Sequence, residues 1–168
     1  KNTADLNNVS LLASYAAQQQ FKSLNRECQQ LRELIIKKID SVRFNYGLLT
    51  ASSSYYHVLE QEIQKDYSMG YTEEIGYRAS TAVPFYFYDL NNDLQTSLKI
   101  HPVVADESGF RKISSQKAFN KLIELYEKLP TSSALYAVSF SNAIFNVDRL
   151  KNNWRDQFIN YIQYYATN

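Results

Sequence analysis

The sequence predicts an α/β protein of parallel βα units, with a β-hairpin excursion at about residues 75–106. Short β-rich runs alternate with amphipathic helical patterns, an order that is typical of parallel strands. Within 75–106, a cluster of turn residues separates two further β-rich runs. Right-handed crossovers bring the C-terminal ends of parallel strands to one shared edge. Four or five such strands are too few for a closed eight-stranded barrel, and they resemble half of one.

The first part of the chain carries three predicted strands and two predicted helices. Residues 8–16 read as a short buried strand. Apolar residues then recur at three- and four-residue spacing from Gln18 to Ile39, which predicts an amphipathic helix. Ser41–Leu49 is strand-like, and Ser52–Ser54 supplies N-cap residues for a second helix that ends near residue 64. Asp66–Tyr71 is a brief third strand.

The second part begins with the hairpin, whose turn is Asn91-Asn92-Asp93. A helix then begins at Ser114 or Ser115 and ends before Pro130. Ala134–Ser141 reads as a buried strand. One face of a final helix is apolar and consists of Val147, Leu150, Trp154, Phe158 and Ile162. We expect Trp154 to anchor that helix in the core.

Length and composition predict one domain and exclude several function classes. Eighteen basic and seventeen acidic side chains among 168 residues give a net charge of +1, which indicates no nucleic-acid binding. No apolar run is long enough for a membrane span. The single cysteine, Cys28, excludes an internal disulfide, and its place on an apolar helix face predicts an inert core thiol.

Two features of composition leave alternatives open. Fourteen tyrosines suit either the rim of a core or surfaces that face sugars, because tyrosine joins an apolar ring to a hydroxyl. The chain starts at Lys1 without a signal-peptide pattern, so either a leader has been removed or the chain is a piece of a longer protein. The compartment, cytoplasm or cell envelope, stays open.

Residues 66–90 read DYSMGYTEEIGYRASTAVPFYFYDL, and a T-x-L-x-I-x-P-x-x-x-x-D pattern runs from Thr96 to Asp106. This stretch resembles the NodB-homology domain of polysaccharide deacetylases, carbohydrate esterase family four, in its Bacteroidetes-type subgroup. That subgroup typically reads D-Y-S-M-G-Y, then G-[FY]-R-A-G-T, then P-F-x-F-[YF]-D-L. Ser80 departs from it, because the subgroup has glycine there. The resemblance runs from about residue 9 to the C-terminus.

The resemblance implies a distorted (β/α) barrel and metal-dependent hydrolysis of N- or O-acetyl groups on polysaccharides. In the family, one Asp and two His hold zinc or another divalent metal, which polarises water and the acetyl carbonyl. A second Asp is the general base, and a His near the last strand is the acid. Both aspartates lie in an early motif that this chain lacks, so the resemblance implies a missing N-terminal half.

Three histidine positions of the family hold other residues here. Leu12 stands at the first metal-binding histidine, within a segment where Ser14 and Tyr15 match the family. Asn45 stands at the second, two residues after a matching Arg43. Ser141 replaces the catalytic histidine. Leucine cannot coordinate a metal, asparagine is a weak zinc ligand, and serine cannot replace an imidazole acid. We therefore expect no metal, no cofactor and no catalytic residue.

Other family positions are retained as polar side chains that we expect either in a remnant of the cleft or in structural ion pairs. They are Ser14, Tyr15, Arg43, Asp66, Arg78, Asp89, Asp106 and Asn142. The two histidines, His57 and His101, lie 44 residues apart in sequence, and we expect both to be structural.

Three functions remain open at this point. The first is a catalytically silent deacetylase-like domain that binds a glycan or a protein partner through the former cleft. The second is an active carbohydrate deacetylase completed by a missing N-terminal segment. The third is a structural fragment that pairs its open sheet edge with a second copy of the chain.

Overall fold

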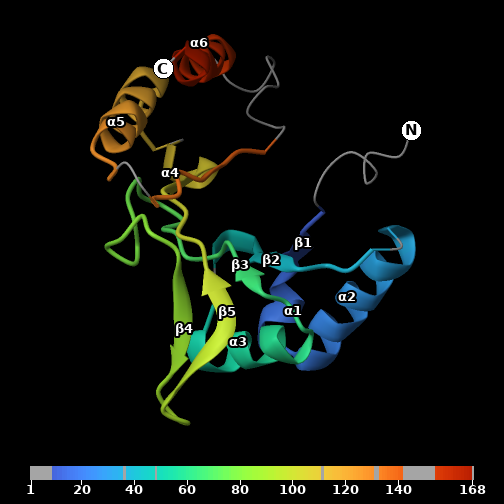
Figure 1. Cartoon of the computed structure of the whole chain (residues 1–168). Helices are drawn as coiled ribbons and strands as arrows, with labels where there is room; N and C mark the ends of the chain where they lie inside the picture. The colour runs from blue at the N-terminus through green and yellow to red at the C-terminus, as the bar shows by residue number, and fades with distance from the viewer. Residues whose placement is uncertain are drawn as a thin grey trace. The chain divides into compact units, whose positions relative to one another are not determined.

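The computed structural model describes residues 9–35, 37–47, 49–110, 112–130, 133–141 and 154–167. The chain divides into two compact units, which are described one at a time (Figure 1). Unit 1 comprises residues 1–69 and 84–101, and unit 2 comprises residues 70–83 and 102–168. Among the sequence predictions, Lys1, Asn142, Val147 and Leu150 lie outside the described residues.

The described residues of unit 1 form five strands, three α-helices and one short 3-10 helix. In chain order these are β1 (Leu11–Ala13), α1 (Tyr15–Gln19), α2 (Phe21–Ile35), β2 (Ser41–Phe44), η2 (Asn45–Gly47), α3 (Ala51–Glu60), β3 (Lys65–Asp66), β4 (Phe85–Asp89) and β5 (Leu94–Ile100). The α/β class, the parallel sheet and a hairpin within 75–106 are therefore confirmed.

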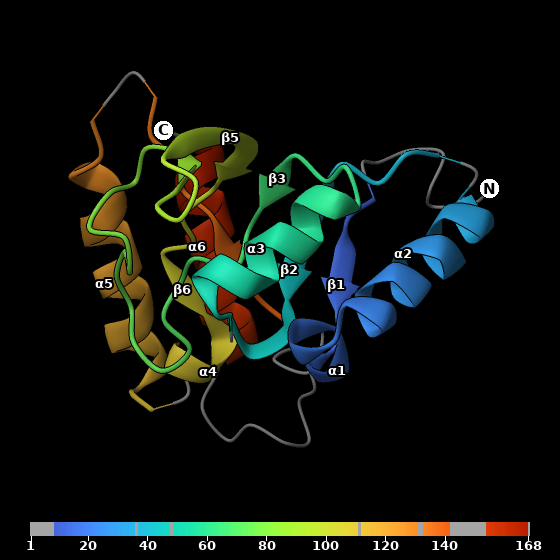
Figure 2. The same cartoon turned by 90° about the horizontal axis from the view of Figure 1, so that it is seen from below.

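The strands of unit 1 lie in the order β1-β2-β3-β5-β4. The first four run parallel, and β4 pairs antiparallel with β5. Helical connections join β1 to β2 and β2 to β3, and the sheet advances by one strand each time. Crossovers of one hand then place their helices on one face of the sheet. Figure 2 shows α2 and α3 on the same side of β1, β2 and β3.

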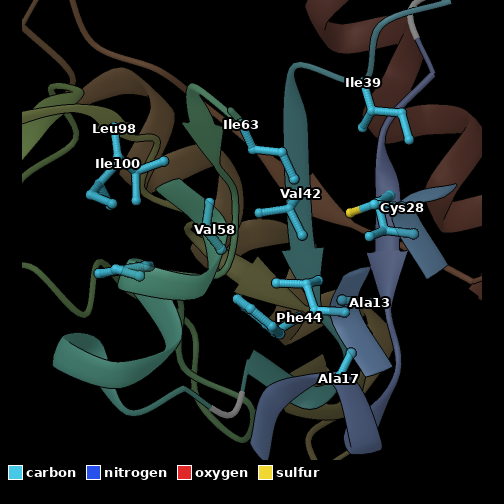
Figure 3. Packing of buried hydrophobic residues seen from close by; sticks show 13 residues of the cluster. Ala13, Ala17, Cys28, Ile39, Val42, Phe44, Val58, Ile63, Leu98 and Ile100 are labelled. Carbon is cyan, nitrogen blue, oxygen red and sulfur yellow. The ribbon is translucent and has the colours of Figure 1, made fainter. Parts of the chain in front are cut away.

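The face of the sheet that carries these helices holds the core of unit 1. Strand residues Leu11, Ala13, Val42, Phe44 and Ile100 pack there against side chains of α1, α2 and α3 (Figure 3). Full burial of each large apolar side chain contributes about 1.5–3 kcal/mol. Cys28 belongs to this cluster, and burial raises the pKa of its thiol, as expected of an inert core cysteine.

Side chains alternate between the two faces along each strand. The register pairs Leu12 with Arg43, Lys65 with Lys99, and Lys99 with Tyr86. Since the neighbours of these residues point into the core, their own side chains point the other way. We call the side of the sheet that bears them the second face.

Several element boundaries differ from the prediction. The strand predicted over 8–16 is confined to Leu11–Ala13, because Ser14 caps α1. The helix predicted from Gln18 to Ile39 is α2, which covers Phe21–Ile35 only. The first two predicted residues end α1 instead, and Gln20, whose backbone is extended (φ −130°, ψ 112°), separates the two helices. The second helix begins at Ala51 with Thr50 as N-cap, ahead of the predicted serines.

Unit 2 is a helical unit with one small sheet. Its elements are β6 (Ala105–Asp106), α4 (Glu107–Phe110), α5 (Ser115–Glu127), β7 (Val138–Ser139) and α6 (Trp154–Thr167), and β6 pairs parallel with β7. The predicted strand 134–141 is thus reduced to two residues. The core is aromatic: Phe119 contacts Trp154 and Tyr161, and Trp154 is 3% exposed, as expected of an anchor.

Among the described residues, no helix is both long and apolar enough to cross a membrane.

Candidate functional site

The carboxyl edge of the unit 1 sheet gathers several of the predicted site residues. Strands β1, β2 and β3 are adjacent and parallel, and they end at Ala13, Phe44 and Asp66. Ser14 and Tyr15 follow β1 directly, and Asn45 follows β2. Loops at the carboxyl ends of parallel strands commonly form ligand sites in α/β proteins.

Asp66 lies buried beneath this edge and links several elements by hydrogen bonds. Its carboxyl group is fully buried and accepts hydrogen bonds from Ser68 Oγ (2.6 Å), Ser68 N (3.0 Å) and Tyr55 Oη (3.1 Å). Burial raises the pKa of Asp66 to about 6, against these hydrogen bonds and the nearby Arg43 charge, which lower it. Ser68 Oγ also accepts a bond from Phe44 N (2.8 Å). Asp66 therefore ties β3 to α3 and β2, and holds the edge together from inside.

Arg43 lies on the second face and is half-buried. Its guanidinium donates to the carbonyl oxygen of Tyr67 at 3.2 Å, just beyond the end of β3. Leu12 is its register partner on β1 and is 63% exposed. An apolar side chain therefore stands beside Arg43, at the position where the resemblance to the deacetylases predicts a metal ligand.

Ser14 has a structural role that accounts for its contacts. Its hydroxyl accepts a hydrogen bond from Ala17 N (3.3 Å) as the N-cap of α1 and donates to Glu27 Oε1 (2.5 Å). Its backbone N–H donates to Glu27 Oε2 (3.0 Å). Glu27, on α2, was not among the predicted site residues, because its helical spacing alone gives no sign of this contact.

Two exposed tyrosines follow the ends of β1 and β2, which are neighbouring strands of the sheet. Tyr15 opens α1 two residues after the end of β1, and the residue is 54% exposed. Tyr46 lies within η2 immediately after β2 and is 61% exposed. Tyr46 has a left-handed backbone (φ 60°, ψ 14°), and its N–H donates a hydrogen bond to Asn45 Oδ1 at 3.0 Å. Tyr46 was not among the predicted site residues, because the pattern of residues 41–49 predicts a strand.

Asp89 lies away from this edge. It pairs with Leu94 at the start of β5, whereas Asp66 pairs with Ile100 at its end. Six residues of strand separate the two levels by about 20 Å. Asp89 accepts hydrogen bonds from Tyr56 Oη, Asn92 Nδ2 (2.7 Å) and Asn91 N (2.9 Å), and these bonds hold its pKa below the ordinary value. It therefore orders the hairpin turn.

The remaining predicted residues belong to unit 2. Asp106 ends β6 and accepts bonds from the backbone N–H (3.1 Å) and hydroxyl (2.7 Å) of Ser108. Ser141 follows β7, the strand next to β6, and its N–H donates to Glu107 Oε2 at 2.6 Å. Arg78 is exposed in a turn. Glu107, a buried carboxylate that joins α4 to the segment after β7, was not among the predicted site residues.

The side chains at these positions do not fit the zinc ion of the deacetylase family. Leu12 has no atom that can coordinate a metal ion. The side-chain oxygen of Asn45 already accepts a hydrogen bond from the backbone N–H of Tyr46. His57 lies on α3 near Glu60, and His101 stacks on Tyr67. Within the described part of the chain, no three His, Cys, Asp or Glu side chains are grouped as metal ligands.

Comparison with known proteins yields no relative: no protein-family model, no curated protein and no solved structure matches the chain. The resemblance to the polysaccharide deacetylases therefore stays a prediction, and so does the role that it implies for each matching residue. The side chains at the carboxyl edge of the unit 1 sheet are the remaining indication of function.

Proposed function

We propose that this chain is a catalytically silent, polysaccharide-deacetylase-like domain, resembling half of a distorted (β/α) barrel, that binds carbohydrate without hydrolysing it. The binding site is the carboxyl edge of β1 and β2. The supporting observation is the pair of exposed tyrosines, Tyr15 and Tyr46, which follow these two adjacent strands.

An exposed aromatic ring offers a sugar a flat apolar surface with a polar hydroxyl at its tip. Two such rings on neighbouring strands, which lie about 4.8 Å apart, can contact a single sugar or two consecutive sugars. Asn45 and Arg43 on β2 and its loop add hydrogen-bonding groups that suit sugar hydroxyls.

The conformation of Tyr46 supports a role for its side chain. A left-handed backbone costs a residue other than glycine about 1–2 kcal/mol, and asparagine or glycine would adopt it more readily. Strained positions of this kind cluster at ligand sites, where the surrounding structure holds them. Burial does not explain the residue, because most of its ring is exposed.

Hydrolysis is not part of the proposal because the family positions lack suitable chemistry. Ser141 has a hydroxyl that does not titrate near neutral pH, and it cannot protonate a leaving group as an imidazole would. Leu12 cannot bind a metal ion.

The test is a glycan array with the whole chain, followed by calorimetric titration with the best-bound glycan. Tyr46→Ala and Tyr15→Ala should each weaken binding roughly tenfold, since one aromatic contact contributes on the order of 1 kcal/mol or more. Tyr71→Ala is the matched control, because Tyr71 is another exposed tyrosine, in unit 2. Unchanged affinity in both edge variants would refute the site.

A separate assay addresses catalysis. The chain is incubated with acetylated xylan and with chitin oligosaccharides, with and without zinc, and released acetate is measured. We expect none above the buffer blank. Acetate release that scales with protein concentration and disappears on chelation would contradict the silent-domain proposal.

Self-association is a second candidate, favoured by the position of β4. This strand forms one edge of the unit 1 sheet. Its Tyr88 is 47% exposed, and Leu90, the first residue after the strand, is 86% exposed. An apolar edge strand pairs readily with a copy of itself. Light scattering at increasing concentration should then show a dimer that Tyr88→Lys abolishes. A monomer throughout would exclude this candidate.

A further inference from the structure

A row of side chains crosses the second face of the unit 1 sheet. Lys65 on β3 stands directly opposite Lys99 on β5, and Lys99 stands directly opposite Tyr86 on β4. The ammonium group of Lys99 lies 5.7 Å from the centre of the Tyr86 ring. Tyr86 is 48% exposed, and the side chain of Lys65 is 40% exposed.

Lys65 and Lys99 place two positive charges directly opposite one another. Like charges on opposed residues destabilise a sheet, so stability does not explain this pairing. Lys65 is compensated by Asp40, whose Oδ2 lies 2.7 Å from its ammonium group. Lys99 has no carboxylate within ion-pair distance among the described residues; its partner is the Tyr86 ring. A net positive charge therefore remains beside an exposed aromatic ring.

His101 extends the same alternation two residues beyond Lys99. Its ring stacks on Tyr67 with 4.7 Å between centroids and 23° between planes. Both ring nitrogens are buried without a hydrogen-bond partner in the described part of the chain. Burial lowers the pKa of His101, and the charges of Lys99 and Lys65 lower it further. The pKa of His101 therefore depends on the positive charge of Lys99 and Lys65.

We propose that Lys65, Lys99 and Tyr86 form a subsite for an anionic sugar, in which the two ammonium groups hold a carboxylate or sulfate substituent and Tyr86 contacts the sugar ring. This inference rests on the proposed function for its carbohydrate part and names the class of glycan: an acidic polysaccharide.

The geometry suits an anionic substituent better than a neutral hydroxyl. Opposed residues on adjacent strands bring their side chains within about 5 Å, so two ammonium groups can bond different oxygens of one carboxylate or sulfate. Tyr86 adds a flat apolar surface, which a sugar ring uses and an isolated inorganic anion does not. Binding of this kind weakens with added salt, because the charges are only partly shielded from solvent.

The experiment compares calorimetric titrations of the whole chain with oligogalacturonate, with a sulfated oligosaccharide and with neutral cello-oligosaccharide of equal length. Lys99→Gln should weaken binding of the acidic ligands about tenfold and leave neutral binding unchanged. Lys99→Arg should restore it, because it returns the charge. Lys117→Gln, which removes an exposed lysine from α5, is the control and should change nothing. Preference between carboxylate and sulfate identifies the substituent.

The two histidines provide an independent readout by NMR. A bound anion offsets the positive charge near His101, so oligogalacturonate should raise the pKa of His101. The ring signals of His57, which lies on α3 beside Glu60, should keep their positions and serve as the internal control. In Lys99→Gln the ligand should leave the pKa of His101 almost unchanged.

The outcomes separate this inference from the proposed function. Equal binding of acidic and neutral ligands, sensitive to Tyr46→Ala but not to Lys99→Gln, would overturn the anionic subsite and keep the glycan site. Acidic binding sensitive to Lys99→Gln alone would keep the subsite and overturn the site at Tyr15 and Tyr46. Equal competition by duplex DNA would indicate a general polyanion surface and overturn the inference. Absence of any binding would overturn both.

Discussion

Replacing Asp66 with asparagine tests the buried carboxyl group that supports the sheet edge of unit 1. Asp66 is fully buried, and its pKa rises from 3.8 to about 6, mainly because burial disfavours the charged form. In the unfolded chain the carboxyl group titrates near its ordinary value. The folded protein therefore holds one more proton than the unfolded chain between about pH 4 and pH 6.

The sign of the effect follows from that extra proton. Stability rises with pH only where the unfolded state binds more protons, so here the contribution of Asp66 falls as pH rises through this window. The two pKa values differ by a factor of roughly 150 in proton affinity, which corresponds to ~3 kcal/mol. Asparagine does not titrate, and its amide can still exchange hydrogen bonds with Ser68 and Tyr55. Between pH 4 and pH 7 most of this difference is expressed, so the free energy of unfolding of Asp66→Asn should gain about 2 kcal/mol relative to that of the wild type.

Urea denaturation followed by circular dichroism, at pH values from 4 to 8, measures this difference. Hydrogen exchange at the amides of Phe44 and Ser68 localises it, since both are tied to this network. Glu33→Gln, which changes an exposed carboxylate on α2, is the control and should parallel the wild type. If Asp66→Asn also ran parallel to the wild type over the whole range, the carboxyl group would not be the buried titrating group that its surroundings indicate.

Three further predictions concern unit 2 and metal binding. Tyr136→Phe should lower the free energy of unfolding by about 1–3 kcal/mol in thermal melts, because the Tyr136 hydroxyl donates to Leu122 O (2.8 Å) and accepts from Tyr161 Oη (3.0 Å) inside a buried cluster. Gly109→Ala should cost about 1–3 kcal/mol in the same assay, because a Cβ there would lie 3.1 Å from the backbone nitrogen of Glu74. Zinc at a few equivalents should leave the melting temperature unchanged; a rise that saturates at one equivalent would identify a metal site and contradict our interpretation of Leu12 and Asn45.

Much of the architecture of unit 1 could be predicted because its signals are periodic and long. The helical repeat of apolar residues marks α2, whose Leu24 and Cys28 reach the core. Alternation of strands and helices implies parallel pairing, which the sheet order confirms. The hairpin was predictable because Asn91-Asn92-Asp93 has the composition of a turn, and Asp93 there adopts a positive φ of 53°.

The ends of these elements could not be predicted, because two local preferences compete there. Ser14 sits in an apolar run that suits a strand, yet its hydroxyl is an efficient N-cap and α1 begins after it. Gln20 breaks the helical pattern with an extended backbone although its type favours helix. For Ser14 a tertiary contact contributes, the hydrogen bond to Glu27, and the linear pattern does not contain it.

The candidate site shows the same limit in another form. Arg43 and Asp66 could be placed near one another, since both lie toward the ends of adjacent parallel strands. That Asp89 lies far from these two residues could not be predicted, because a match to a family pattern does not tell in which direction a strand runs. Its strand, β4, runs antiparallel, and this places Asp89 at the opposite end of the sheet.

Tyr46 shows why a functional position can escape a pattern. Residues 41–49 are apolar and β-prone enough to predict a strand through Leu49, and a strand would bury or pair each of them. The chain instead turns at Asn45–Gly47, where Tyr46 and Gly47 have consecutive positive φ angles of 60° and 56°. Glycine tolerates that geometry, but tyrosine does so at a cost, and its ring gains little burial in return. A residue that adopts an unfavourable backbone conformation without gaining packing is often part of a functional site, where binding a ligand is its role. Tyr46→Gly is therefore expected to stabilise unit 1 or leave it unchanged while weakening carbohydrate binding, a combination that a purely structural tyrosine would not produce.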